Sequence, residues 1–312
     1  MSELMSSGER WFALESGFSE DLPRYWGDWG VDSEVGRLRS VLLRRPGAEV
    51  ELMTDPAEAR WLDLMDVDLA RSQHDALAEI YRDHGVDVHY IEEMAPDKPN
   101  ALFVRDQVVM TPEGAIVARP ALAVRRGEER YAAQTLAGLG VPIIRTVSGS
   151  GTFEGADLMW VDRTTVILGV GNRTNREGAS QIEEILRRMG VQTFLYFQVP
   201  YGQAHIDGLF NLASTDICVF FPWQTPFEVA DALRRRGYQM LEINSPHEAK
   251  QTMASNFVCL EPGKIVMPEG SPRTQEQLEE AGVEVLTLDV SELQKGWGGI
   301  HCMTAFLHRD EV

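Results

Sequence analysis

One of the three cysteines stands where a nucleophile is expected. Cys302 follows the glycine-rich run GWGGIH, residues 296–301. Glycines let the backbone come close to a ligand, and a cysteine beside such a loop can be partly exposed, with its thiolate stabilised by neighbouring donors or cations. Cys218 and Cys259 lie inside short apolar runs, and we interpret both as packed strand positions, which is where most free cysteines lie.

A histidine and several carboxylates stand at the edges of other apolar runs. In the segment HIDG, His205 and Asp207 are two residues apart, and in a strand this spacing would point both side chains to one face. In the segment FEGAD, Glu154 and Asp157 flank small residues that let a ligand approach. Each of these pairs, taken alone, also fits a hydrogen-bonded pair or a solvated turn.

Asp106 and two arginines complete the candidates. Asp106 lies in the apolar segment FVRD, where a buried aspartate requires a partner, and the preceding Arg105 could supply it. Arg126 and Arg173 lie in arginine-containing segments at the starts of two predicted helices. Arginine binds carboxylates bidentately, although basic runs at such positions are usually solvated surface.

These groups come from equivalent ends of different repeats, and together they predict a single composite site. A cysteine with a histidine and carboxylates suits nucleophilic catalysis. Without the cysteine, the same histidine and carboxylates could bind manganese or zinc. No HExxH or CxxC spacing is present, so the pattern favours a site without a metal.

The elements that position these residues form a repeating unit of strand, strand, helix and strand, present about five times. The predicted strand pairs cover 34–45, 103–119, 158–169, 210–221 and 257–267; the helices cover 126–139, 175–190, 226–237 and 274–282; the third strands cover 141–146, 191–197, 239–243 and 283–288. An insertion around 56–85 is predicted to hold one or two helices. A period of this length with one sheet per unit favours a propeller-like closed array, and an ordinary mixed α/β sheet is the alternative.

Composition limits the partners and the location. The 312 residues carry 29 Lys and Arg against 48 Asp and Glu, a formal net charge of −19. Such a surface repels nucleic acid and anionic membranes, so neither is expected as a partner. The chain has no apolar run of membrane-spanning length and no signal-peptide layout at its start. Three cysteines do not form a disulfide framework, and we expect a cytoplasmic protein.

The ordered set FVRD, FEGAD, HID and GGIHC resembles the guanidino-group-modifying superfamily. That superfamily includes arginine deiminases, dimethylarginine dimethylaminohydrolases, agmatine deiminases and amidinotransferases. The resemblance runs from the segment WGV at residue 29 to Cys302, nearly the whole chain. It implies the five-bladed α/β propeller called the pentein fold, as one catalytic domain over residues 1–312.

The resemblance also implies roles for the candidate residues. Cys302 matches the nucleophile, His205 the general acid and base, and Glu154 the carboxylate that holds the guanidinium and works with the histidine. The substrate-binding residues that it implies are Asp106 and Asp207 for the guanidinium and Arg126 and Arg173 for the substrate α-carboxylate. Asp157 matches a structural position.

The implied activity is a cysteine-dependent hydrolysis of a small-molecule guanidine, arginine or a substituted arginine, through a covalent thiouronium intermediate and without a cofactor or metal. An amidinotransferase with the same site is the alternative, since an acceptor amine can replace water. The position of Ala156, where deiminases usually have glycine, and the length of the chain, which is shorter than a deiminase, leave the subfamily open. A metal-dependent guanidine hydrolase, a non-catalytic acidic propeller and assembly into a homo-oligomer also remain open.

Overall fold

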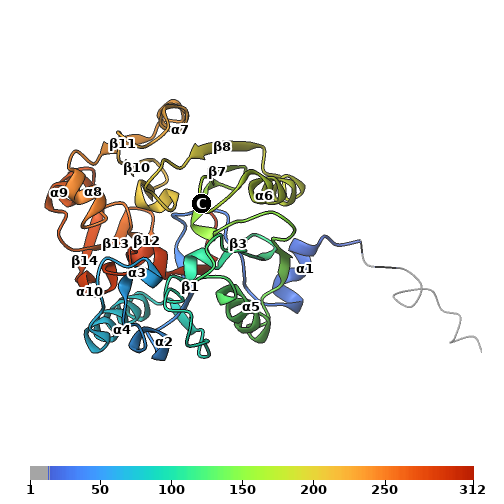
Figure 1. The fold of residues 1–312 in the computed structure, drawn as a ribbon. Coiled ribbons are helices and arrows are strands. Elements are labelled where there is room, and N and C mark those ends of the chain that lie inside the picture. The colour runs from blue at the N-terminus through green and yellow to red at the C-terminus, as the bar shows by residue number, and fades with distance from the viewer. Residues whose placement is uncertain (1–12, 14) are drawn as a thin grey trace, which may run out of the picture.

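Five small sheets of three strands each form a ring in the computed structural model, which describes residues 13 and 15–312 (Figure 1). The sheets contain β3 (Val108–Thr111), β4 (Gly114–Val117) and β5 (Ile143–Thr146); β6 (Leu158–Asp162), β7 (Thr165–Val170) and β8 (Thr193–Gln198); β9 (Phe210–Ser214), β10 (Ile217–Phe220) and β11 (Gln239–Glu242); β12 (Val258–Glu261), β13 (Lys264–Pro268) and β14 (Glu284–Leu288); and β15 (Ala305–Arg309), β1 (Leu38–Leu43) and β2 (Asp87–Tyr90).

Every sheet has the same internal order. Its middle strand pairs antiparallel with one neighbour and parallel with the other. The antiparallel pairs are almost fully buried, whereas the third strands β2, β5, β8, β11 and β14 are largely half-buried or exposed. The third strands therefore form the outer edge of each blade, and the antiparallel partners lie toward the centre of the ring.

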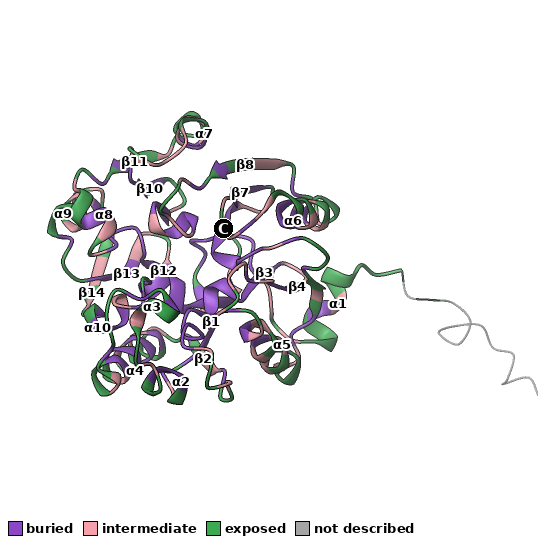
Figure 2. Cartoon of the chain, viewed as in Figure 1, coloured by how far each residue is buried: buried purple, intermediate pink, exposed green. Residues whose placement is uncertain are grey.

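Amphipathic helices connect the middle and outer strands of each blade. They are α4 (Val67–Asp83), α5 (Glu128–Leu139), α6 (Arg176–Arg188), α7 (Phe227–Arg235) and α9 (Pro272–Glu280). In α6, Asn175 caps the first turn by accepting from the backbone of Gly178, and Ile182 and Leu186 are fully buried against the sheet. The helices lie around the periphery and present their exposed faces outward (Figure 2). A parallel outer strand requires such a crossover connection.

The predicted strand pair at 34–45 is wrong in one respect. This segment contains a single strand, β1, and its antiparallel partner is β15 at the other end of the chain, with Val41 opposite Phe306 and Leu42 opposite Ala305. The first and last strands thereby close the ring, because they pair within one blade. The other four predicted pairs, all four outer strands and the helices of the insertion, α3 (Pro56–Ala59) and α4, are confirmed.

The observed architecture is the five-bladed α/β propeller, and the alternative of one mixed sheet is wrong. The shorter helices α1 (Phe18–Tyr25), α2 (Ala48–Glu51), α8 (Pro246–Lys250), α10 (Ser291–Gln294) and α11 (Ile300–Met303) lie between the blades' regular elements. Within the described residues, no helix is both long and apolar enough to cross a membrane.

Candidate active site

A pocket of about 390 Å³ brings together most of the residues predicted from the sequence. Cys302, His205, Asp207, Asp106 and Arg173 line it. Glu154 does not line the pocket itself but is fully buried behind His205. Among these side chains the thiol, the imidazole and the carboxylates are all at least nine-tenths buried, so their charges interact strongly.

Three short turns place the polar residues. The 3-10 turns η2 (Val104–Asp106), η3 (Gly155–Asp157) and η4 (Ile206–Gly208) each come just before the inner strand of a blade. Glu154 and His205 are the residues that begin the second and third turns. The expectation that His205 and Asp207 share a strand face is therefore wrong, and the predicted strand start at Asp106 is also a turn. Equivalent turns in successive blades converge because the ring is closed.

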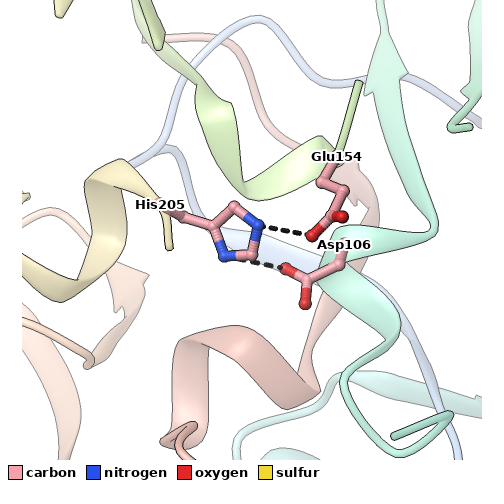
Figure 3. A group of neighbouring side chains, drawn as sticks. All are labelled: Asp106, Glu154 and His205. Atoms are coloured by element: carbon pink, nitrogen blue, oxygen red, sulfur yellow. Dashed lines mark hydrogen bonds and ion pairs between the residues drawn. The ribbon is translucent and has the colours of Figure 1, made fainter. Parts of the chain in front are cut away.

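His205 lies between two carboxylates, as Figure 3 shows. Its Nε2 lies 2.7 Å from Oε2 of Glu154, and its Nδ1 lies 3.6 Å from Oδ1 of Asp106. Burial alone would lower the pKa of His205, but the negative charges of Asp106 and Glu154 and the hydrogen bond to Glu154 raise it to about 9. Burial alone would raise the pKa of Glu154, yet its hydrogen bond with His205 and the nearby positive charges hold it well below its usual range. At neutral pH the pair is an imidazolium and a carboxylate.

Cys302 lies in α11 and is held from two sides. Asn256 donates from Nδ2 to the sulfur at 3.1 Å and accepts at Oδ1 from the Cys302 amide at 3.2 Å. The thiol donates to Oδ2 of Asp207 at 3.2 Å. The glycines before it are required by this packing, because a Cβ at Gly298 would lie 2.2 Å from the Phe103 ring.

The thiol is more buried than expected, with 7% of the residue exposed. Burial and the negative charges of Asp207 and Asp106 raise the pKa of Cys302 well above its usual range. Of the expected donors or cations beside the sulfur, the structure shows a donor, Asn256, while the nearest charged groups are carboxylates. A cation bound between these carboxylates would neutralise the charges that keep the thiol protonated.

The two predicted arginines differ in placement. Arg173 lines the pocket, donates from Nη1 to Oε2 of Glu154 at 3.0 Å, and has a buried Nε without a partner among the described residues. Arg126 is exposed, donates to the carbonyl of Pro120 at 3.1 Å, and does not line the pocket. The neighbouring Arg125 lines it instead. We therefore do not retain Arg126 as a substrate-binding residue.

Arg125 positions Asp106 rather than offering a free guanidinium. Its Nη1 donates to Oδ2 of Asp106, and its Nε and Nη2 donate to Glu128 at 3.0 and 2.8 Å. Burial raises the pKa of Glu128 to about 7 in spite of this pairing. The other oxygen of Asp106, Oδ1, is buried without a hydrogen-bond partner among the described residues. That oxygen is available to an N–H donor in the pocket.

The sequence reasoning missed a buried network behind the cysteine. His301 bonds to Asp207 at 2.9 Å through Nδ1 and to Glu34 at 2.7 Å through Nε2. These two hydrogen bonds raise the pKa of His301 although burial opposes the shift. Burial alone would raise the pKa of Asp207, but the bond from His301 holds it below its usual range. His301 therefore keeps Asp207 ionised beside the thiol, and Glu34 holds His301 in place.

Asp106, Glu154 and His205 have ligand atoms within 4.8 Å of one another and form a geometric candidate for a metal site. Positive charges already occupy their surroundings: Arg125 pairs with Asp106, and Arg173 pairs with Glu154. A metal ion would also have to displace the proton of His205, because the histidine must be neutral to coordinate. The donor set therefore fits an organic cation in the adjacent pocket better than a metal ion.

The buried carboxyl group of Asp157 should make the stability of the protein depend on pH. Neither of its carboxylate oxygens has a hydrogen-bond partner among the described residues, and burial raises its pKa from 3.8 to about 7. The folded protein thus holds a proton that the unfolded chain releases, and stability from this group is lost as the pH rises toward about 7. We expect Asp157→Asn to raise the melting temperature, relative to the unsubstituted protein, more at pH 8 than at pH 5. Asp83→Asn, an exposed control, should show no such pH-dependent difference; an equal difference at both pH values for Asp157→Asn would contradict the assignment.

Comparison with known proteins finds similarity to guanidine-modifying enzymes. The dimethylarginine dimethylaminohydrolase of Pseudomonas aeruginosa is 28% identical over 273 residues, which cover 85% of this chain and 98% of that enzyme. An arginine deiminase of Lactococcus lactis is 23% identical over 405 aligned positions, covering 90% and 98% of the two chains. The solved structure of a cysteine-to-serine variant of the P. aeruginosa enzyme, complexed with citrulline, superposes with a TM-score of 0.72 at 25% identity and covers 86% of this chain and 99% of that chain.

One family matches most of the chain. Residues 63–309 match the family described as N,N dimethylarginine dimethylhydrolase, eukaryotic. The matched region contains all strands of the five blades except β1, and it includes the catalytic candidates Cys302, His205 and Glu154. By this match the protein belongs to the N,N-dimethylarginine dimethylhydrolase family.

Proposed function

We propose that the protein is a hydrolase that cleaves a C–N bond of a guanidine substrate, with Cys302 as nucleophile and His205 as acid and base. The observation that carries the proposal is the convergence, on one pocket, of a thiol, a protonated histidine and two buried carboxylates. The relatives' names point to arginine or a substituted arginine as the guanidine. The buried free cysteines suit a reducing compartment, and we keep a cytoplasmic location as part of the proposal.

The carboxylates would hold the substrate. A guanidinium is a planar cation whose N–H groups match carboxylate oxygens. Asp106 offers the unpartnered Oδ1, and Asp207 lies against the thiol. Each of these carboxylates has one cationic partner, Arg125 or His301, and keeps an oxygen on the side of the pocket to accept from the N–H groups of a guanidinium. The same binding lowers the pKa of Cys302 and lets it ionise as the substrate arrives.

The chemistry then follows from the positions of the side chains. The Cys302 thiolate attacks the central guanidinium carbon, and a tetrahedral adduct forms. His205 donates its proton to the departing nitrogen, the C–N bond breaks, and a thiouronium remains on Cys302. The neutral His205 then takes a proton from water as it attacks the same carbon. Breakage of the C–S bond releases a urea-type product and restores the thiolate.

Asp207 should affect thiol reactivity and guanidine turnover in opposite directions. Asp207→Asn removes the anion nearest to the sulfur, so the pKa of Cys302 should fall and alkylation by the neutral reagent iodoacetamide at pH 8 should become about tenfold faster. Guanidine turnover should decrease, because half of the cation site is lost. Labelling is measured in a background with Cys218 and Cys259 changed to serine. Slower alkylation in Asp207→Asn would contradict the proposed electrostatic role.

Chelation should leave activity unchanged. The carboxylates near His205 already pair with Arg125 and Arg173, and the proposed mechanism gives no step to a metal. The measurement is the rate of guanidine hydrolysis before and after dialysis against a strong chelator. Loss of activity on dialysis, with recovery on adding manganese or zinc, would favour the metal-dependent alternative.

A substrate panel tests the proposed function directly. The protein is incubated with arginine, its Nω-methylated derivatives and agmatine, with and without glycine as an acceptor amine. Citrulline with ammonia indicates a deiminase, citrulline with methylamines indicates the dimethylaminohydrolase reaction, and transfer of the amidino group to glycine indicates an amidinotransferase. Failure of every guanidine to react, with a folded protein and an intact thiol, would overturn the proposal.

A further inference from the structure

The pocket contains two cationic side chains that the proposed chemistry does not use. Arg60 and Lys250 line it together with the cysteine and the carboxylates. Neither makes an ion pair or a side-chain hydrogen bond with any residue that the structure describes. Other described cations also lack an ion pair, but these two lie on the same pocket as the proposed nucleophile and are available to an anionic group of a ligand.

The backbone holds both cations in place. Arg60 ends α3 in a left-handed conformation with φ of 61°. Its neighbours are pinned by Asn100, which donates to the carbonyl of Ala59 at 3.0 Å and accepts from Nε1 of Trp61 at 2.7 Å. A left-handed non-glycine residue is costly and persists where the surroundings enforce it. The backbone position of Arg60 is thus fixed at the edge of the pocket, and its side chain is exposed.

Lys250 is fixed in a similar way. It is the last residue of α8, and it follows the buried Ala249, which also lines the pocket. Glu248, two residues before Lys250, accepts from the amide and hydroxyl of Thr274 at 2.9 and 2.7 Å. These hydrogen bonds connect α8 to α9. The backbone is anchored, while the half-buried lysine side chain itself carries no partner among the described residues.

The acidic residues that line the pocket are Asp106 and Asp207, which lie beside His205 and Cys302 respectively. The proposed function assigns both to the guanidinium. Neither forms an ion pair with Arg60 or Lys250, and among the described residues the pocket lining has no further acidic group for an ammonium. An α-amino acid would place its ammonium among these cations, where like charges repel.

We propose that Arg60 and Lys250 bind an anionic group at the far end of the substrate, and that the preferred substrate is a guanidino acid without a free α-ammonium. Such compounds include 5-guanidinopentanoate, which is arginine without its amino group, and Nα-acylated arginines. This inference rests on the proposed function, and it narrows the substrate class of that same site.

Three compounds that share a guanidino group on a four-carbon chain test the preference. 5-Guanidinopentanoate carries only the carboxylate, arginine carries both groups, and agmatine carries only the ammonium. We expect kcat/KM to decrease in that order, with about tenfold between the first two, the size expected for one charge interaction. A higher kcat/KM for arginine than for 5-guanidinopentanoate would overturn the inference and leave the proposed hydrolase function standing.

Substitutions then test the residues. Arg60→Gln and Lys250→Gln should each raise KM for 5-guanidinopentanoate about tenfold more than KM for agmatine. Arg24→Gln removes the same charge from α1, outside the pocket. It should change KM for 5-guanidinopentanoate and KM for agmatine by the same small factor. Equal changes for both substrates in the pocket variants would show that the cations do not contact the anionic end.

A binding measurement separates this inference from the chemistry. Calorimetric titration of the Cys302→Ser protein should show tighter binding of 5-guanidinopentanoate than of agmatine, and Arg60→Gln in the same background should remove that difference. Such binding without turnover by the unsubstituted enzyme would support the anion site and contradict the hydrolase. Turnover of agmatine with no measurable binding preference for the carboxylate would support the hydrolase and contradict the anion site.

Discussion

Changing Cys302 to serine is expected to lower kcat/KM for the guanidine substrate by about four to six orders of magnitude, as the loss of a nucleophile does in other enzymes. A serine hydroxyl remains protonated under conditions in which a substrate-neutralised thiol ionises, so attack on the guanidinium carbon nearly stops. The fold should persist, because Asn256 can hold the hydroxyl and the amide of residue 302 as it holds those of the cysteine. The measurements are product release and thermal unfolding of the same preparation.

The other cysteines supply matched controls. Cys218 lies in β10 with its sulfur 3.2 Å from the sulfur of Met240, and burial raises its pKa to about 12. Cys259 lies in β12, where burial likewise raises its pKa to about 12 and its thiol donates to backbone carbonyls. Serine at either position should keep activity, and at Cys218, where a hydroxyl lacks an oxygen partner, it should cost about 1–3 kcal/mol of stability. Normal turnover in Cys302→Ser, or loss of turnover in both controls, would exclude the covalent mechanism as assigned.

Most of the fold could be predicted because the repeating unit is local. Each hairpin, its crossover helix and its outer strand lie within one continuous segment, so periodicity and turn residues reveal them. The exception is the blade that contains β1, whose inner strand β15 comes from the other end of the chain. Pairing between the two chain ends depends on ring closure, and no local pattern indicates it.

The site could be predicted by residue type but less well by geometry. The sequence predicts a strand start at Asp106 and a shared strand face for His205 and Asp207, whereas both segments form short 3-10 turns surrounded by apolar neighbours. A signal for Asn256 was present: it follows His205 at the same interval at which His205 follows Glu154. In these three blades that position lies a few residues before the inner strand, β6, β9 or β12.

The choice between adjacent arginines required the structure. Arg125 and Arg126 are indistinguishable by type, and only the start of α5 determines which one turns inward. Arg125 pairs with Glu128 across one helical turn and thereby reaches Asp106. The protonation of the Cys302 thiol could not be predicted from the sequence either, because it depends on charged residues that other blades place around the sulfur.

Changing His205 to alanine is expected to trap a covalent adduct that Glu154→Ala does not trap. The probe is an S-methylisothiourea analogue of the substrate, because methanethiol departs without needing a proton from His205. In His205→Ala the thiol can still attack and the leaving group still departs, but water lacks its base. Hydrolysis should slow by about 10²- to 10⁴-fold, and mass spectrometry should find the protein heavier by the amidine group on Cys302.

Glu154→Ala changes the protonation of the histidine rather than removing it. Without Glu154, His205 loses its 2.7 Å partner while Arg125 and Arg173 remain nearby, so the pKa of His205 should fall from about 9. A larger share of His205 is then neutral at pH 7, although the charge of Asp106 remains, and the neutral imidazole can still activate water, which keeps the adduct from accumulating. With an ordinary guanidine, whose amine must be protonated as it leaves, the same variant should be slow at the first step and again show little adduct. Equal adduct in both variants would mean that His205 is not the base of the second step. No adduct in either, with Cys302 intact, would place the histidine's role before attack rather than after it.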